Sequence, residues 1–155
     1  MKLFIILVIS VFLNMGVLYA ESLKVVYDLT TGDSKKIEKQ LLGSVKAVAK
    51  YYASEKITLK VIVVISGDAY KYFIDELDFS PYASDVDAAN AEKLFKPRLA
   101  ELNDVYGVTF FMCSNGMRAR KIDRDMLYKY VHADLMKSVY LIDAQNNGYA
   151  YMPIH

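Results

Sequence analysis

The only cysteine of the chain, Cys113, lies in the segment FFMCSNGMRARKID (110–123). Apolar residues precede it, and a glycine-containing turn with the basic residues Arg118, Arg120 and Lys121 follows it. The thiolate is the reactive form of cysteine, and free amide groups at a turn or helix start, together with nearby cations, lower the pKa of a thiol. This pattern predicts a nucleophilic Cys113. The alternative is an inert cysteine buried at the end of a strand, because free cysteine is among the most buried residue types.

The other candidate groups for catalysis do not form a recognisable pattern. His132 and His155 lie in no cluster of His, Cys or Asp with metal-ligand spacing, so we expect no metal site. Ser66 and Ser114 lack the G-x-S-x-G pattern of a nucleophilic serine, and we expect both to make turn hydrogen bonds instead. Cys113 is therefore the main candidate for chemistry.

The segment YDLTTGDSKK (27–36) is similar in part to the phosphate loop of flavodoxins, which would imply a flavin-binding redox domain. However, Asp28 and Asp33 would face a phosphate with like charge, and Leu29 stands where a hydroxyl is expected. The favoured interpretation is a strand-to-helix turn in which Asp33 is the N-cap residue. We therefore predict no cofactor.

Three apolar runs predict strands that are buried on both faces. They are LKVVYDLT (23–30), TLKVIVVIS (58–66) and VTFFMC (108–113), in which β-branched and aromatic residues occur without polar alternation. Such runs are typical of parallel strands covered by helices. A short strand near 130–132 and a final strand in YAYMPI (149–154) bring the number to about five. With helical patterns between the strands, the sequence predicts an α/β fold, a three-layer sandwich with a mainly parallel sheet.

Apolar residues at spacings of three and four predict two long helices. The buried face of the first consists of Ile37, Leu41, Val45, Val48 and Tyr52. The buried face of the second, over 87–106, consists of Ala91, Phe95, Leu99 and Leu102. Pro97 lies inside the second helix and lacks a backbone donor, so we expect a kink or a break there.

The last third of the chain carries weaker helical signals. Asp123 is predicted to cap a short helix. Leu135, Val139 and Ile142 mark the apolar face of a last helix. Between the second strand and the second long helix, the turn-rich connection DFSPYASDVD (78–87) is a candidate lid or interface loop.

The predicted strands bring polar residues together at one edge of the sheet. Asp28 and Thr30 end the first strand, Gly67 follows the second, and Cys113 ends the third. Ligands of such sheets bind beyond the carboxyl ends of the strands, so we expect these residues to line one site. Tyr70 follows shortly after Gly67, where it can border the same pocket.

Residues 1–20, MKLFIILVISVFLNMGVLYA, predict export. One lysine is followed by an apolar stretch and then by small residues near Ala20, which is the order of a secretory signal peptide. Cleavage would leave residues 21–155 as a single periplasmic or secreted domain with no stable membrane anchor. An uncleaved N-terminal anchor is the alternative.

The charge balance argues against nucleic acid as a partner. The chain holds 19 Lys and Arg against 18 Asp and Glu, and loss of Lys2 with the signal peptide would leave equal numbers. A neutral chain lacks the basic excess that binding to a phosphate backbone requires. An aromatic content of 13% and a mean hydropathy of +0.16 are high for a small soluble monomer, so we expect a homo-oligomer.

Four segments together resemble the DsrE/DsrF-like family. They are KVVYDLTTGDSKKIEKQLLGSV (24–45), VIVVISGDAYKYFI (61–74), YGVTFFMCSNGMRARKID (106–123) and LIDAQNNGYAYMPI (141–154). The resemblance implies a small α/β domain that assembles into trimers or hexamers. In several members a cysteine after the third strand carries sulfur as a persulfide, and Cys113 occupies the matching place. By this resemblance Cys113 would accept sulfur, and Asn115 with nearby amide groups would stabilise the anion.

The function that this resemblance implies is thiol chemistry of the sulfur-carrier or sulfurtransferase type, with a sulfur-donor or sulfur-acceptor protein as partner. The signal peptide departs from the cytoplasmic relay members, whose partners an exported protein would not meet. One alternative is a non-catalytic oligomeric binding or assembly module in which Cys113 is structural. A weaker third alternative is the flavin-binding redox domain.

Overall fold

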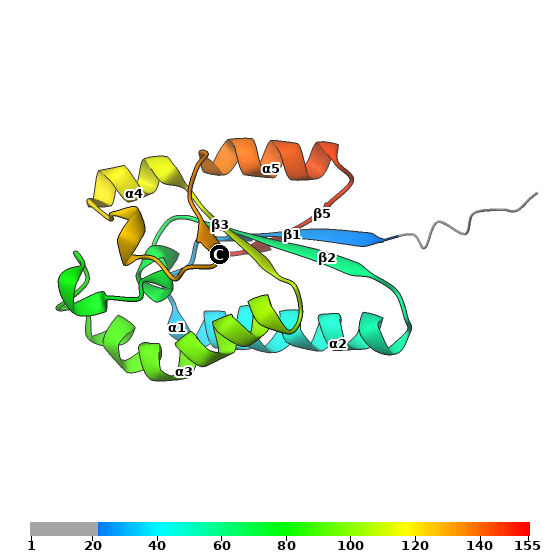
Figure 1. Cartoon of the computed structure of the whole chain (residues 1–155), viewed down its shortest axis with the longest axis horizontal. Coiled ribbons are helices and arrows are strands. Elements are labelled where there is room, and N and C mark those ends of the chain that lie inside the picture. The colour runs from blue at the N-terminus through cyan, green and yellow to red at the C-terminus, as the bar shows by residue number, and fades with distance from the viewer. Residues whose placement is uncertain (1–21) are drawn as a thin grey trace, which may run out of the picture.

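Five parallel strands form one sheet within residues 22–155, the part of the chain that the computed structural model describes (Figure 1). The strands are β1 (Leu23–Leu29), β2 (Leu59–Ile65), β3 (Thr109–Met112), β4 (Val131–His132) and β5 (Ala150–Ile154). Their order is β4-β3-β2-β1-β5, and each neighbouring pair is parallel. The predicted parallel sheet of about five strands is confirmed. The predicted signal peptide, residues 1–20, lies outside the described residues.

Helices cover both faces of this sheet, which explains why its inner strands are largely apolar on both faces. On one side lie α1 (Ser34–Lys36), the π-helical segment η1 (Ile37–Val45), α2 (Lys46–Ser54) and α3 (Val86–Asp104), and on the other lie α4 (Ser114–Arg120) and α5 (Lys137–Asn146) (Figure 1). Short 3-10 helices occupy the connections: η2 (Ala69–Phe73), η3 (Leu77–Phe79) and η4 (Arg124–Met126). Residues of β1 alternate between two cores, because Tyr27 and Leu29 belong to the larger core and Val26 belongs to the smaller one under α5.

The first long helix has the predicted N-cap residue and buries most of the residues that were predicted for its apolar face. Asp33 is its N-cap residue, and its Oδ1 accepts hydrogen bonds from the amides of Lys35 and Lys36. The segment η1 is π-helical, and the wider turn of i→i+5 hydrogen bonding shifts the pattern of buried positions. Ala49 is therefore buried beyond η1, where Val48 was expected.

Of the kink or break expected at Pro97, the break is wrong, because α3 runs through this residue without interruption. Phe95 and Leu99 lie on either side of Pro97 in the sequence and are both buried in the larger core. Pro97 itself is exposed. The packing of its neighbours outweighs the loss of one backbone donor on the solvent side of the helix.

The predicted apolar face of the last helix is also wrong. Tyr140 and Ala144 are the buried residues of α5, whereas Leu135 precedes the helix and is 43% exposed, and Ile142 is 56% exposed. The Tyr140 ring stacks on Phe111 of β3 with centroids 4.6 Å apart. An aromatic side chain with a polar tip, rather than the aliphatic residues, therefore orients the helix.

The predicted short helix after Asp123 is the 3-10 helix η4, and its cap differs from the expected one. Asp123 occupies the N-cap position, but its side chain makes no capping hydrogen bond. The Met126 amide donates instead to the Asp123 carbonyl oxygen at 3.2 Å. The backbone alone closes such a tight i→i+3 turn.

Strand β5 is at one edge of the sheet and pairs only with β1. Ile154 faces β1, because its carbonyl oxygen accepts from the Thr30 amide at 3.0 Å. The backbone groups of successive residues point to opposite sides of a strand. Those of Pro153, which precedes Ile154, and of Tyr151 therefore point away from the sheet. Tyr151 and Met152 are 42% and 49% exposed.

Candidate functional site

Cys113 follows β3 directly and occupies the N-cap position of α4. Its amide donates to the Ile65 carbonyl oxygen of β2 at 2.9 Å, which fixes the backbone at the junction of strand and helix. The chain turns to one face of the sheet after β2 and to the other after β3 (Figure 1). The crevice outside the carboxyl ends of these two strands is the place where α/β sheets bind ligands. Cys113 is half-buried there.

The surroundings of Cys113 favour the thiolate. Burial alone would raise the pKa of the thiol, but the amides of Gly116, Lys137 and Asn115 and the hydroxyl of Tyr70 lower it, and the net pKa lies below its ordinary value. The Tyr70 hydroxyl also donates to the Cys113 carbonyl oxygen at 3.0 Å. Because that hydroxyl has a single proton, the amide groups are the main stabilisers of the anion.

Tyr70 is packed against the start of α4. It lies in η2 with 1% of its surface exposed, and burial raises the pKa of its hydroxyl, which therefore keeps its proton. A Cβ atom at Gly116 would lie 1.9 Å from the Tyr70 hydroxyl oxygen, so only glycine allows this approach. The Arg120 guanidinium lies 4.8 Å from the centre of the Tyr70 ring. The tyrosine is thus packed closely against the start of α4, and its role in binding stays a prediction.

Asp28 lies beneath the same edge of the sheet and is 3% exposed. Lys137, the first residue of α5, places its Nζ 2.8 Å from the Asp28 Oδ1. The Tyr151 hydroxyl donates to the Oδ2 at 2.9 Å. Asp28 is therefore connected to Cys113 through Lys137, which pairs with Asp28 by its side chain and lowers the pKa of the Cys113 thiol by its backbone amide.

Thr30 and Gly67 lie in contact where the loop after β1 passes the loop after β2. Gly67 has φ of +63°, and a Cβ atom there would lie 2.5 Å from the Thr30 carbonyl oxygen, so the position requires glycine. The Asp68 amide donates to this carbonyl at 3.0 Å, and the Thr30 hydroxyl is 2.7 Å from His155 Nδ1. Among the described residues, neither Thr30 nor Gly67 is hydrogen-bonded to Cys113. A binding role for Thr30 and Gly67 stays a prediction.

Asn115 and Arg118 lie on the exposed side of α4. The Arg118 guanidinium donates to the side-chain oxygen of Asn115. The Asn115 backbone amide contributes to lowering the pKa of Cys113, whereas Arg118 is not among the main groups that do so. A ligand-binding role for either side chain stays a prediction.

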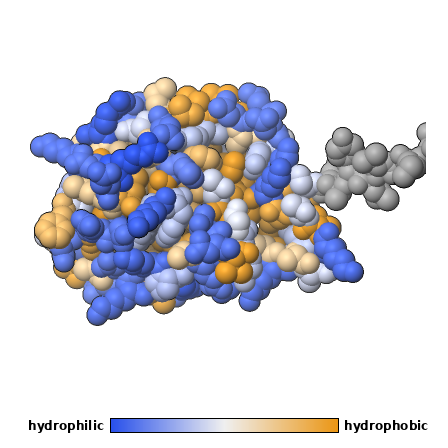
Figure 2. Space-filling view, viewed as in Figure 1, coloured by the Kyte–Doolittle hydropathy of each residue, from blue (hydrophilic) through white to orange (hydrophobic). Residues whose placement is uncertain are grey.

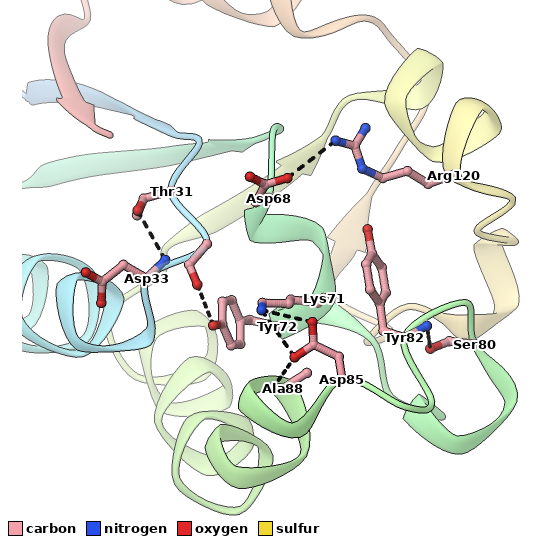
Figure 3. Close-up of polar contacts among 11 residues, drawn as sticks. Thr31, Asp33, Asp68, Lys71, Tyr72, Ser80, Tyr82, Asp85, Ala88 and Arg120 are labelled. Atoms are coloured by element: carbon pink, nitrogen blue, oxygen red, sulfur yellow. Dashed lines mark hydrogen bonds and ion pairs between the residues drawn. The ribbon is translucent and has the colours of Figure 1, made fainter.

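A polar cleft with a volume of about 420 Å³ lies between the β1–α1 loop, the start of η2 and the 78–87 connection (Figure 3). Its lining residues are Gly32, Asp33, Asp68, Lys71, Tyr82 and Asp85. Lys71 pairs with Asp85 at 3.0 Å, and Arg120 reaches Asp68 at 3.7 Å. Burial would lower the pKa of Lys71, but its contacts with Asp85 and Tyr72 raise the net value. The 78–87 connection thus contributes Tyr82 and Asp85 to the cleft, and its role as a lid or interface stays a prediction.

The β1–α1 loop is the strand-to-helix turn that the sequence favours over a phosphate loop. Its amides at Lys35 and Lys36 are already bonded to Asp33, at 2.9 Å and 3.2 Å. These donors would otherwise be the ones available to an anion. Within residues 22–155, no group of His, Cys, Asp or Glu is arranged to hold a metal ion.

Three residues of the site were not predicted to act on it in this way. Gly116 makes room for Tyr70, Arg120 covers the ring of Tyr70, and Lys137 brings its amide to Cys113. Gly116 and Arg120 lie within a few residues of Cys113, so a glycine after the cysteine was a usable signal. Lys137 lies far along the chain, and its proximity follows from the tertiary structure, in which the Ser114 amide donates to the Leu135 carbonyl oxygen just before α5.

Comparisons with known proteins agree with this architecture. A solved structure titled as a protein of unknown function, MTH1491 from Methanobacterium thermoautotrophicum, is similar to the chain with a TM-score of 0.62 and 20% sequence identity. The match covers 85% of this chain and 99% of that one, and at this identity it supports the fold alone. No curated protein matches the sequence. The model of the DsrE/DsrF-like family matches residues 24–154, so the chain belongs to the DsrE/DsrF-like family.

Proposed function

We propose that this family member performs thiol chemistry of the sulfur-carrier type, with Cys113 as the sulfur acceptor. The observation that carries the proposal is the half-buried thiol at the crevice between β2 and β3, faced by amide groups of α4 and α5. Amides that stabilise a thiolate also stabilise the terminal sulfur anion of a persulfide, because both carry one negative charge on sulfur. The family resemblance supports the same role.

In the proposed step, the Cys113 thiolate attacks the outer sulfur of a donor persulfide. A sulfur–sulfur bond forms at Cys113 as the donor's sulfur–sulfur bond breaks, and the electron pair leaves with the donor thiolate. The step needs no oxidant, because one thiolate and one persulfide give another thiolate and another persulfide. A donor or acceptor protein would dock at the crevice.

A specific observation favours the alternative of an assembly module. Figure 2 shows hydrophobic side chains gathered at the top of the view, over α5. The exposed large hydrophobic residues of this region are Leu135, Met136 and Ile142. Such a surface fits the proposed homo-oligomer, trimer or hexamer, with or without a reactive Cys113.

The pH dependence of iodoacetamide labelling tests the thiol chemistry. In the folded protein, the labelling rate should reach half its maximum at a pH below about 8.5, the ordinary pKa of a cysteine. The expected cause is the excess of amide and hydroxyl stabilisation over the cost of burial. Labelling is followed by mass spectrometry on the protein starting at Glu21.

The same protein in urea is the control, because unfolding removes the amides from the sulfur. Its labelling midpoint should return to the ordinary value. A folded protein that resists labelling, or one whose midpoint equals that of the unfolded chain, would support the assembly module with a structural cysteine.

Export of the protein is a second part of the proposal, based on the order of charged, apolar and small residues in 1–20. No helix in residues 22–155 has the length and apolar character needed to cross a membrane. Expression of the full-length gene should yield a periplasmic or secreted chain whose N-terminal sequence begins at or near Glu21. Recovery of the intact chain from the cytoplasm would contradict this part.

A further inference from the structure

Asp28 is a buried carboxylate that the proposed thiol step does not use directly. It is 3% exposed and lies on β1, between β2 and β5. A buried charge is costly unless it is paired and hydrogen-bonded, so its presence in the sheet calls for a structural or functional reason.

We propose that Asp28 and Lys137 are positioning residues for Cys113: their ion pair fixes the first turn of α5 so that the Lys137 amide stays against the sulfur. The inference rests on the proposed thiol chemistry and deepens it. It replaces the expected ligand-binding role of Asp28 with a role exerted through Lys137.

The anchor of this arrangement is the sheet itself. Lys137 Nζ forms an ion pair with the Asp28 Oδ1 at 2.8 Å, without the geometry of a hydrogen bond. The Tyr151 hydroxyl donates to the Asp28 Oδ2 at 2.9 Å. Since β1 is hydrogen-bonded to strands on both sides, the carboxylate has little freedom to move. The side chain of Lys137 is thereby tied to the carboxyl end of β1.

The residues that link the Asp28 carboxylate to the Cys113 sulfur are Lys137 and the loop before it. Lys137 is the first residue of α5, and amides of a first helical turn have no partner within the helix. The loop before it is held as well, because the Ser114 amide donates to the Leu135 carbonyl at 3.0 Å. The Tyr140 hydroxyl accepts from the Asp134 and Leu135 amides at 2.9 Å and 3.0 Å. The ion pair between Asp28 and Lys137 therefore restrains the start of α5 further, at the residue whose amide lowers the pKa of the Cys113 thiol.

Without the Asp28 partner, the positive charge of Lys137 at the start of α5 would be electrostatically unfavourable. A cation at the start of a helix opposes the helix dipole, so a lysine at this position needs another partner. Asp28 is that partner. Among titratable side chains, Tyr70 from η2 acts on the Cys113 thiol, and Arg120 from α4 lies over the Tyr70 ring.

The test compares Asp28→Asn with the wild-type protein by the labelling midpoint of Cys113. Loss of a negative charge near a thiol would by itself lower the midpoint. Loosening of the Lys137 amide would raise it, by about half a pH unit, which is about a threefold loss of thiolate at neutral pH. The direction of the change therefore separates positioning from direct electrostatics.

Lys137→Met provides a second, independent measurement. Its midpoint should rise as well, and hydrogen exchange at the first amides of α5 should accelerate, which loss of a charge alone would not cause. Lys137→Arg keeps the cation and should restore both readouts. Asp143→Asn, which removes an exposed carboxylate farther along α5, is the matched control and should leave both unchanged.

The outcomes also separate this inference from the function on which it rests. An ordinary midpoint in the wild-type protein overturns the thiol chemistry itself. A low wild-type midpoint that Asp28→Asn lowers or leaves unchanged overturns the positioning role alone. If Asp28→Asn does not fold, unchanged hydrogen exchange in Lys137→Met overturns it.

Discussion

Cys113→Ser is expected to abolish iodoacetamide labelling and any persulfide on the native protein while leaving the fold intact. Serine has a similar volume and is a favoured N-cap residue, so it suits the position that Cys113 occupies before α4. The free energy of unfolding at neutral pH should therefore change by less than about 1 kcal/mol. Mass spectrometry of the native protein measures the adducts, and urea unfolding measures the stability.

The stability difference between the two proteins should also depend on pH. Although burial raises the pKa of the Cys113 thiol, its amide and hydroxyl contacts leave the folded-state value lowered. The resulting stabilisation is fully present above the unfolded-state pKa, about 8.5, and is lost as the pH falls through the folded-state value. Wild type should therefore gain stability relative to Cys113→Ser as the pH rises through this window. A difference that stays constant with pH would contradict a stabilised thiolate.

Gly116→Ala is expected to destabilise the protein by about 1–3 kcal/mol and to raise the labelling midpoint of Cys113. The added Cβ atom would lie 1.9 Å from the Tyr70 hydroxyl oxygen and 2.6 Å from the ring carbon that bears it. Tyr70 is fully buried and cannot move aside without opening the core. The start of α4 must shift instead, which moves its amides away from the sulfur. Urea unfolding and the labelling profile measure the two effects.

Two further variants give this prediction its controls. Ala119→Ser changes an exposed residue of the same helix and should alter the stability by no more than about 0.5 kcal/mol. Tyr70→Phe, introduced together with Gly116→Ala, removes the closest of the clashing atoms and should recover part of the lost stability. If Gly116→Ala alone is as stable as wild type, the close packing of Tyr70 on α4 is not a constraint on the fold.

The sheet could be predicted because the sequence of each inner strand is itself typical of a buried parallel strand. β1, β2 and β3 are apolar on both faces, and only a parallel sheet covered by helices buries such runs completely. The errors arose where tertiary packing overrides local preference. Pro97 is tolerated in α3 because Phe95 and Leu99 hold the helix on the sheet, and no local rule contains that contact.

In the candidate site, too, some residues could be placed from the sequence and others depend on tertiary packing. Cys113 and Tyr70 could be placed together because each follows a strand, and parallel strands end at the same edge. The contribution of Lys137 could not be predicted, since it depends on how α5 packs on β1 and β2 and on an ion pair with distant Asp28. The face of α5 was misjudged because Tyr140, with a polar tip, is the residue that packs.

The outward edge of β5 limits how copies of this protein can join. The backbone groups of Pro153 point away from β1, and proline has no N–H to offer a further strand. A chain approaching this edge would find a gap in the row of donors, which discourages extension of the sheet into a continuous intermolecular ribbon. The exposed Tyr151 and Met152 side chains remain available for contact. Association along β5 would therefore rely on side chains, and the same proline protects an otherwise open edge from fibrous aggregation.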